Sequence, residues 1–410
     1  MRKVGREDFG TRSAERSRKW TAGAALLAMA VAIPLWAQQS RVYRDGNSWV
    51  EEITGTLPAS RQVRVTTDLG SVQVQGTSRG VTYVIRKRSY APSEEAARRQ
   101  FEQMRISAIK NADGAFIEGR LMNRNLDRFN ADFLVQIPRQ LESVKVETRG
   151  GSLNFSSIAA TVVGATGGGW VKLDDLDGTV KITSGGGNVD VGRLGADFSL
   201  TTGGGDVRIK NVAGQAHVNI GGGRVYLGSA KGATIQTGAG SIEVRKCNGD
   251  LGASSGGGNL SLGDVNGAVQ ADTTAGSVHL DSAKGQVRVS TGGGSVELFN
   301  LGEGVQVETG AGGITAEFVG KRGSFSASSL HTASGDVLVY LPADLPVTVH
   351  ASSDMATGHG ISSEFSGLRI TKEGSNFIPR SMYAEGVLNG GGPVLKVRTI
   401  IGQIDFRQSR

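Results

Sequence analysis

One short motif has the residue types and spacing of a catalytic nucleophile. Gly252-Ala-Ser-Ser-Gly256 matches the G-x-S-x-G pattern of serine hydrolases. In those enzymes the serine sits on a strained turn that joins a strand to a helix, whereas here Gly257, Gly258 and another strand-like segment follow. Ser254 and Ser255 also recur as Thr or Ser at the equivalent places of neighbouring segments. The sequence therefore predicts structural serines here and no catalytic residue.

Repeated Gly-Gly-Gly clusters could cradle a phosphate with their backbone N–H groups. Such a loop needs a helix N-terminus behind it or a Gly-Lys-Ser/Thr ending. No cluster has either feature, so we interpret the glycines as tight corners of the backbone and predict no cofactor.

The spacing required for metal binding is also missing. None of the five histidines pairs with a second one at ligand spacing: His217, His279, His331, His350 and His359. A calcium ladder would need Asp at one place in successive repeats, but that position reads Asn188, Asp206, Arg224, Ser241, Asn259, Ser277 and Ser295. Asp174, Asp175 and Asp177 form a local acidic loop, which we interpret as solvated, with one weak divalent-cation site as the alternative.

Glycan cleavage would need two carboxylates about 5–10 Å apart in a groove. One outward series of residues reads Lys172, Asp190, Arg208, Tyr226, Glu243, Ser261, His279, Glu297 and Thr315, and a second reads Lys181, Ser199, His217, Thr234, Gly252, Gln270, Arg288 and Gln306. Neither contains an acidic cluster or an aromatic platform for sugars. Cys247, the only cysteine, falls among apolar positions and is predicted to be buried. We predict no enzyme activity.

These residues are positioned by a repeat of 18 residues. Its register follows the glycine clusters, with one step of 17: Gly168, Gly186, Gly204, Gly222, Ala239, Gly257, Ala275, Gly293 and Ala311. Each unit has two stretches of alternating apolar residues, such as Val189/Val191 and Val180/Ile182, and a third apolar column that includes Leu176 and Leu194. Alternation with period two indicates strands, and the glycine content opposes a helix. We predict an all-β fold, a single-stranded parallel β-helix (β-solenoid) with three-sided coils of about 18 residues.

The composition agrees with an exported protein. Glycine accounts for 62 of 410 residues, and more than half of the net charge of +7 lies on residues 1–20. A basic segment before an apolar run from Thr21 to Trp36 is typical of an export signal. We predict cleavage after Ala37, with membrane anchoring through residues 20–37 as the alternative. Because the remainder carries little net charge, nucleic acid is not an expected partner.

Four regions are predicted along the chain. Residues 1–37 form the signal peptide or anchor, 38–145 an N-terminal β-rich cap with one helix near 93–109, 146–318 the solenoid, and 319–410 a C-terminal β cap. Ser93 is the expected N-cap of the helix, with Glu94 and Glu95 in its first turn.

Four parts of the sequence carry a family resemblance: the tandem Thr-Gly-Gly-Gly-x-Val-x-Val units, the strand Val63–Val74, the segment Ser334–Pro342 and the closing segment Val397–Phe406. Together they resemble the bacterial putative-adhesin family of β-strand-repeat cell-envelope proteins. The resemblance covers most of residues 60–406. It implies an envelope-exposed β-solenoid and supplies no catalytic, cofactor or metal-binding residue.

We therefore expect a non-enzymatic module in the periplasm or at the cell surface that binds an envelope component, glycan or protein. The alternatives are a structural element that self-associates through its end strands and, third, a glycan-active enzyme.

Overall fold

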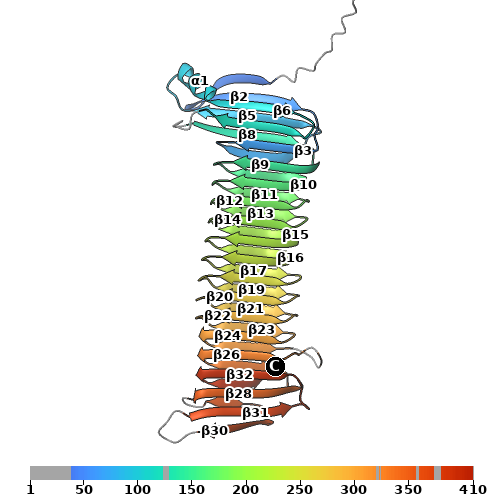
Figure 1. Ribbon diagram of the computed structural model, residues 1–410, viewed down its shortest axis with the longest axis vertical. Helices are drawn as coiled ribbons and strands as arrows, with labels where there is room; N and C mark the ends of the chain where they lie inside the picture. Colours follow the sequence, from blue (N-terminus) through green and yellow to red (C-terminus); the bar gives the residue numbers. More distant parts are fainter. Residues whose placement is uncertain are drawn as a thin grey trace, which may run out of the picture. The chain divides into compact units, whose positions relative to one another are not determined.

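The computed structural model describes residues 38–122, 129–319, 323, 325–356, 360–373 and 380–409. The predicted leader, residues 1–37, and His359 lie outside the described residues. No helix among the described residues is long and apolar enough to cross a membrane. The unit from Ala37 to Arg410 is built almost entirely of strands stacked coil upon coil (Figure 1), so the predicted β-solenoid is confirmed.

The strands form two ladders, which we call the first and the second ladder. In stacking order the first ladder contains β1 (Gln39–Asp45), β2 (Ser48–Leu57), β5 (Val81–Ser89), β8 (Phe129–Ile137), β4 (Ser71–Gly76), the first half of β10 (Leu153–Thr166), β11 (Val171–Leu176), β13 (Val189–Leu194), the first halves of β15 (Val207–Ile220) and β16 (Val225–Thr237), β17 (Ile242–Cys247), β19 (Leu260–Val265), β21 (Val278–Ala283), β23 (Val296–Leu301), β25 (Ile314–Phe318), β27 (Val337–Leu341), β33 (Ile404–Gln408) and β29 (Ile361–Ser363).

In stacking order the second ladder contains β6 (Met104–Lys110), β7 (Ala115–Leu121), β3 (Gln62–Thr67), β9 (Gln140–Thr148), the second half of β10, β12 (Val180–Ser184), β14 (Phe198–Thr202), the second halves of β15 and β16, β18 (Leu251–Ser255), β20 (Val269–Thr273), β22 (Val287–Thr291), β24 (Val305–Ala311), β26 (Ser328–Ser334), β32 (Val394–Ile401), β28 (Val347–Ala356), β31 (Arg380–Leu388) and β30 (Leu368–Glu373). β10 through β27 pair in parallel, as a coil of this kind requires.

Each coil therefore has two strands, whereas a three-sided coil was expected. The third apolar column is not a separate strand, because Leu176 and Leu194 are the last residues of β11 and β13. The inward Val, Leu and Ile side chains of both ladders form one continuous buried core. The 17-residue step lies in the turn inside β16, where the pairing with β15 shifts between Val212 and Gln215.

The glycine corners are dictated by the close stacking of coils. Gly187 has a φ of +97°, and a Cβ atom there would lie 2.8 Å from the carbonyl carbon of Gly169 and closer still to its oxygen. At Gly186 the same added atom would meet nothing within 4 Å. The middle glycine of a cluster is therefore replaceable, and the sequence places Ala239, Ala275 and Ala311 at that position.

A column of buried hydroxyls lines the inside of these corners. Thr166 donates to the carbonyl of Gly151 (2.8 Å), and Thr291 donates to that of Gly276 (2.9 Å). In the other coils, the equivalent position of the second ladder holds Thr148, Ser184, Thr202, Thr237, Ser255, Thr273, Thr309, Thr332 and Thr399. One coil has Ile220 there instead of a hydroxyl residue. Buried carbonyls need hydrogen-bond donors, which explains the Thr or Ser that precedes each of the other glycine corners of this column.

The predicted helix over 93–109 is wrong in its second half. α1 spans Glu94–Glu102, and Met104–Lys110 forms β6, antiparallel to β7. Ser93 is the N-cap as predicted, because its hydroxyl accepts from the N–H of Ala96 at 3.3 Å. β6 contains β-branched Ile106 and Ile109, which favour a strand, and the turn at 111–114 closes a hairpin with β7. Ala97 and Phe101 bury the inner face of α1.

The stack ends in antiparallel pairs on its N-terminal side, whereas on its C-terminal side β30 is antiparallel to β31 and β29 is parallel to β33. β1 and β6 are the outermost strands on the N-terminal side, and β29 and β30 on the C-terminal side. Residues 342–393 are inserted between two coils, so that β32 and β33 pair with β26 and β27 despite their separation in sequence. Antiparallel strands therefore terminate three of the four ladder ends, and the short parallel strand β29 terminates the fourth.

Candidate functional site

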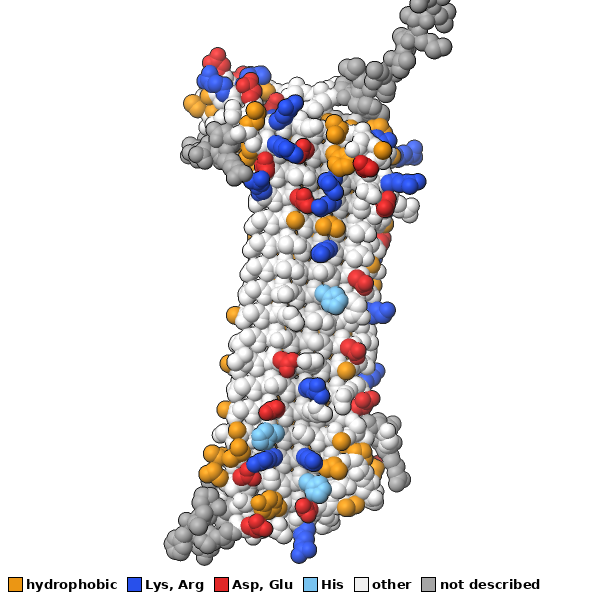
Figure 2. Space-filling view, in the orientation of Figure 1, with side chains coloured by type: hydrophobic (Ala, Val, Ile, Leu, Met, Phe, Trp, Pro, Cys, Tyr) orange, Lys and Arg blue, Asp and Glu red, His pale blue; other side chains and the backbone are white. Residues whose placement is uncertain are grey.

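Outward side chains of the first ladder form two rows along the stack. The first outward row is the series from Lys172 to Thr315 given above. The second outward row lies two residues further along each strand and reads Asp174, Gly192, Lys210, Gly228, Arg245, Gly263, Asp281, Phe299, Glu317, Tyr340 and Arg407. On the face drawn in Figure 2, charged side chains of both signs gather over the N-terminal and C-terminal strands, whereas the middle of the stack carries few.

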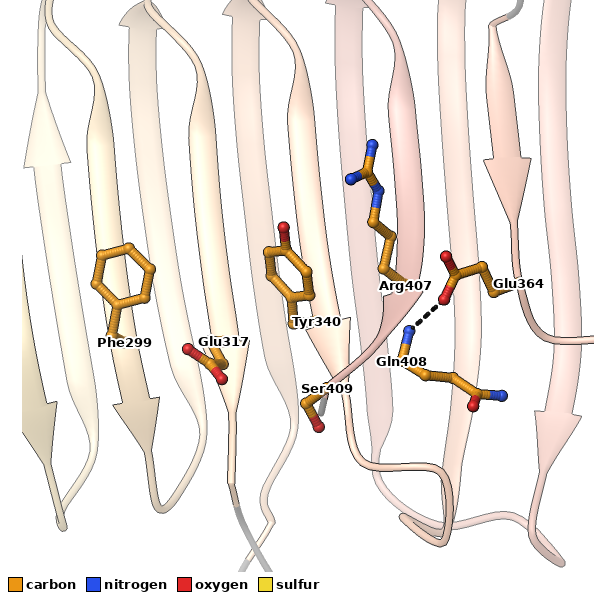
Figure 3. Close-up of a pocket in the computed structure, with 7 residues that line it drawn as sticks. All are labelled: Phe299, Glu317, Tyr340, Glu364, Arg407, Gln408 and Ser409. Atoms are coloured by element: carbon orange, nitrogen blue, oxygen red, sulfur yellow. Dashed lines mark hydrogen bonds between the residues drawn. The ribbon is translucent and has the colours of Figure 1, made fainter.

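A groove of about 750 Å³ lies at the C-terminal end of the second outward row. Its lining consists of Phe299, Glu317, Tyr340, Glu364, Arg407, Gln408 and Ser409 (Figure 3). The first three and Arg407 come from β23, β25, β27 and β33, which are neighbours in the first ladder. The stacking of coils therefore aligns residues that lie far apart in the sequence.

The two aromatic rings of the groove flank a carboxylate. Glu317 pairs with Tyr340 across the ladder, and Phe299 and Glu317 directly follow the paired residues Leu298 and Ala316. Since coils are about 4.8 Å apart, Phe299 and Tyr340 are about 10 Å apart along the stack. Both rings are half-buried, so part of each remains accessible from solvent.

The polar groups of the groove offer both acceptors and donors. Glu364 Oε2 accepts from the backbone N–H of Gln408 at 2.8 Å, and this is the hydrogen bond drawn among the lining residues in Figure 3. Arg407 Nη2 lies 3.9 Å from the carboxylate of Asp405. Glu317 has no hydrogen-bond or ion-pair partner among the described residues. The groove thus offers a hydrogen-bond acceptor in the carboxylate of Glu317 and a hydrogen-bond donor in the guanidinium of Arg407.

His279 borders the groove beside Phe299, with the two ring centroids 5.6 Å apart. Its Nδ1 lies 3.0 Å from Glu297 and its Nε2 lies 3.0 Å from Asp281. Partial burial opposes the charged imidazolium, but the hydrogen bonds of Glu297 and Asp281 outweigh it and raise the pKa of His279 above its usual value.

The acidic loop is neutralised by arginines. Asp175 and Asp177 each form ion pairs with both Arg139 and Arg193. Three of these four pairs have N–O distances of 2.9–3.2 Å, and the Asp175–Arg193 pair is shorter. Hydrogen bonds from Arg193 and from Arg139 lower the pKa of Asp175 and of Asp177, respectively. Because the cations already occupy the carboxylate oxygens, these ion pairs argue against the alternative of a divalent-cation site. Within the described residues no group of three or more His, Cys, Asp or Glu is placed to hold a metal.

The other residues singled out by sequence have structural surroundings. Ser255 is buried and donates to the carbonyl of Gly240 at 2.9 Å, as the hydroxyl column requires, and a strand follows the motif rather than a helix. Cys247 is fully buried, and this burial raises the pKa of its thiol. His350 lies 3.4 Å from Glu385 on the second ladder, away from His279.

Comparison with known proteins confirms the family resemblance. Residues 117–300 match the family model "Toastrack DUF4097". No curated protein matches the chain. Similar solved structures include a putative cell adhesion protein from Clostridium sporogenes (9% identity, TM-score 0.21, covering 88% of this chain and 100% of that one). A putative adhesin from Parabacteroides distasonis is 10% identical with a TM-score of 0.30, and the match covers 71% of this chain and 94% of that one. A putative lipid binding protein from the same organism is 10% identical with a TM-score of 0.24, and the match covers 72% of this chain and 98% of that one. These TM-scores are low, so the fold assignment rests on the family model and the ladders themselves.

Sequence reasoning missed the groove because it followed only the first outward row on this ladder. The aromatic and acidic residues lie in the second row, two positions further on. A signal was present, since Phe299 and Glu317 are 18 residues apart and in register. Tyr340 and Arg407 gave no such signal, because insertions precede both and break the 18-residue period.

Proposed function

We propose that this chain is an exported, non-enzymatic cell-envelope module that binds an envelope component, glycan or protein, along the side of its solenoid. The observation that carries the proposal is the groove on the second outward row, where two rings, two carboxylates and a guanidinium converge. A shallow site with a few convergent polar groups beside aromatic rings is a common design for ligand binding. The basic and apolar leader in the sequence supports export.

The end strands argue against the alternative of end-to-end self-association. β1 carries Arg41, Arg44 and Asp45, and β30 carries Arg369, Lys372 and Glu373. Charged side chains on an edge strand oppose pairing with another chain. On the other C-terminal edge, β29 has three residues and offers little backbone for pairing. We therefore place the interaction surface on the sides of the stack rather than at its ends.

N-terminal mass analysis of the protein from fractionated cells, together with sizing of the soluble fraction, tests the proposal. We expect a monomer in the envelope fraction that begins near Gln38. Leu27→Arg is the matched control, because a charge in the apolar run should retain the chain in the cytoplasm. An intact wild-type chain in the cytoplasmic fraction would contradict export, and filaments that grow with concentration would favour the self-association alternative.

A further inference from the structure

The hydrogen-bonding groups of the groove narrow the chemistry of its ligand. Glu317 and Glu364 are acceptors, whereas Arg407 is a donor one strand beyond Tyr340. A ligand that satisfies both kinds of group must donate and accept within one short stretch. Hydroxyl groups do both, and a polyol presents many of them in a row.

The two aromatic rings add a second requirement. The face of an aromatic ring carries the negative end of its quadrupole. The C–H-rich face of a pyranose is apolar and slightly positive, so it packs on such a ring with weak C–H···π attraction. Phe299 and Tyr340 offer two of these surfaces in one row, with Glu317 between them.

The direction of the row suits a linear ligand. The residues of the row lie on successive strands, so the groove runs along the stack and not along a strand. Its step is about 4.8 Å per coil, close to the length of one sugar in an extended β-linked chain. Rings two coils apart would therefore stack on alternate sugars, while Glu317 accepts hydroxyls from the sugar between them.

The charges disfavour two other extended ligands. An acidic polysaccharide would bring its carboxylates to Glu317 and Glu364. A Lys- or Arg-rich peptide would meet the like charge of Arg407 in the same row. A ligand without charge meets neither obstacle.

From these observations we propose that the groove formed by Phe299, Glu317, Tyr340, Glu364 and Arg407 binds a neutral, linear glycan that lies along the solenoid. This inference rests on the proposed function as a binding module and names its ligand class. The inner rows of the ladder are unaffected by changes at these outward positions, so groove variants are expected to fold.

Isothermal titration of the purified chain with neutral β-linked oligosaccharides of glucose and of N-acetylglucosamine, polygalacturonate, and a Lys/Arg-rich peptide tests the inference. We expect a neutral oligosaccharide to bind with little dependence on salt. Phe299→Ala and Tyr340→Ala should each weaken binding about 3- to 10-fold, the loss of one stacking contact. Tyr340→Phe keeps the ring and should bind nearly as wild type.

Tyr226→Ala is the matched control, because Tyr226 is an outward tyrosine of the same ladder several coils away, beneath Arg208. It should leave affinity unchanged, and circular dichroism should show native strand content in every variant. The inference is overturned if no neutral oligosaccharide binds at millimolar concentration, if Phe299→Ala and Tyr340→Ala bind as wild type, or if only a charged probe binds. These outcomes concern the purified chain, so they leave the export experiment as a separate test of the proposed function.

Discussion

The spacing of coils makes a sharp prediction for two adjacent glycines. Gly186→Ala and Gly187→Ala add the same methyl group at neighbouring positions of one corner. At Gly186 the new atom would enter open space, and at Gly187 it would collide with the backbone of Gly169 in the coil before it. Because both variants gain the same atom, their difference isolates the effect of the corner geometry.

The magnitude follows from two costs at Gly187. An L-residue held at a φ of +97° is strained by about 1–2 kcal/mol. The clash is with backbone, which cannot rotate away, and forced overpacking costs about 1–3 kcal/mol. We therefore expect Gly187→Ala to lower the free energy of unfolding by about 2–5 kcal/mol. Gly186→Ala should instead be neutral or stabilising by up to about 1 kcal/mol, since alanine restricts the unfolded chain.

Urea unfolding measured by circular dichroism and by tryptophan fluorescence is the assay. Trp170 directly follows Gly169, so its share of the tryptophan fluorescence, to which Trp49 of β2 also contributes, reports on this corner, whereas circular dichroism reports on the whole stack. Coils are stabilised by their neighbours, so damage at one corner should lower the midpoint of both signals. Equal midpoints for the two variants, or a larger loss for Gly186→Ala, would refute the reasoning about coil spacing.

Three further predictions concern polar contacts. Thr291→Val should lower the free energy of unfolding in urea by about 1–2 kcal/mol, because the buried carbonyl of Gly276 loses its hydrogen-bond donor. An unchanged unfolding midpoint would contradict the role of the hydroxyl column. Arg193→Ala should leave the midpoint of urea unfolding nearly unchanged, because solvent screens an ion pair at an exposed guanidinium, and added Ca²⁺ should leave the wild-type melting temperature unchanged. Because its folded-state pKa is raised, His279 should stabilise the protein below about pH 6.5, and this contribution should fade as pH rises through the folded-state pKa. The stability difference between wild type and His279→Gln should therefore shrink as the pH rises above about 6.5. NMR titration should show a lower pKa of His279 in Glu297→Gln than in the wild type, because one of the two hydrogen bonds that raise it is weakened.

Local patterning was enough to predict the coil. The alternation of Val, Leu and Ile every second residue determines which side chains face inward, and the 18-residue period determines which residues stack. The third glycine of each cluster is required because the coil before it leaves no room for a Cβ, so the corner could be read directly from composition and spacing. Cys247 was placed correctly for the same reason, since it occupies an inward position of a repeated column.

Longer-range features depended on contacts that the repeat does not encode. The helix beginning at Ser93 ends at Glu102 because the following residues pair with β7, a partner that lies beyond the turn at 111–114. The antiparallel pairs at the stack ends likewise depend on which segment pairs along each edge.

The sequence by itself determined the repeat, the inward core and the glycine corners, because each is a short-range pattern repeated many times. The tertiary structure alone decided how the groove is completed beyond Phe299 and Glu317. Tyr340 joins the row of Phe299 and Glu317 only when β27 pairs with β25 at a step of 23 residues instead of 18. Arg407 joins it only when residues 342–393 are excluded from the coil and β33 pairs with β27. Hydrogen bonding between these strands determines their register, and the 18-residue period of the sequence does not predict it.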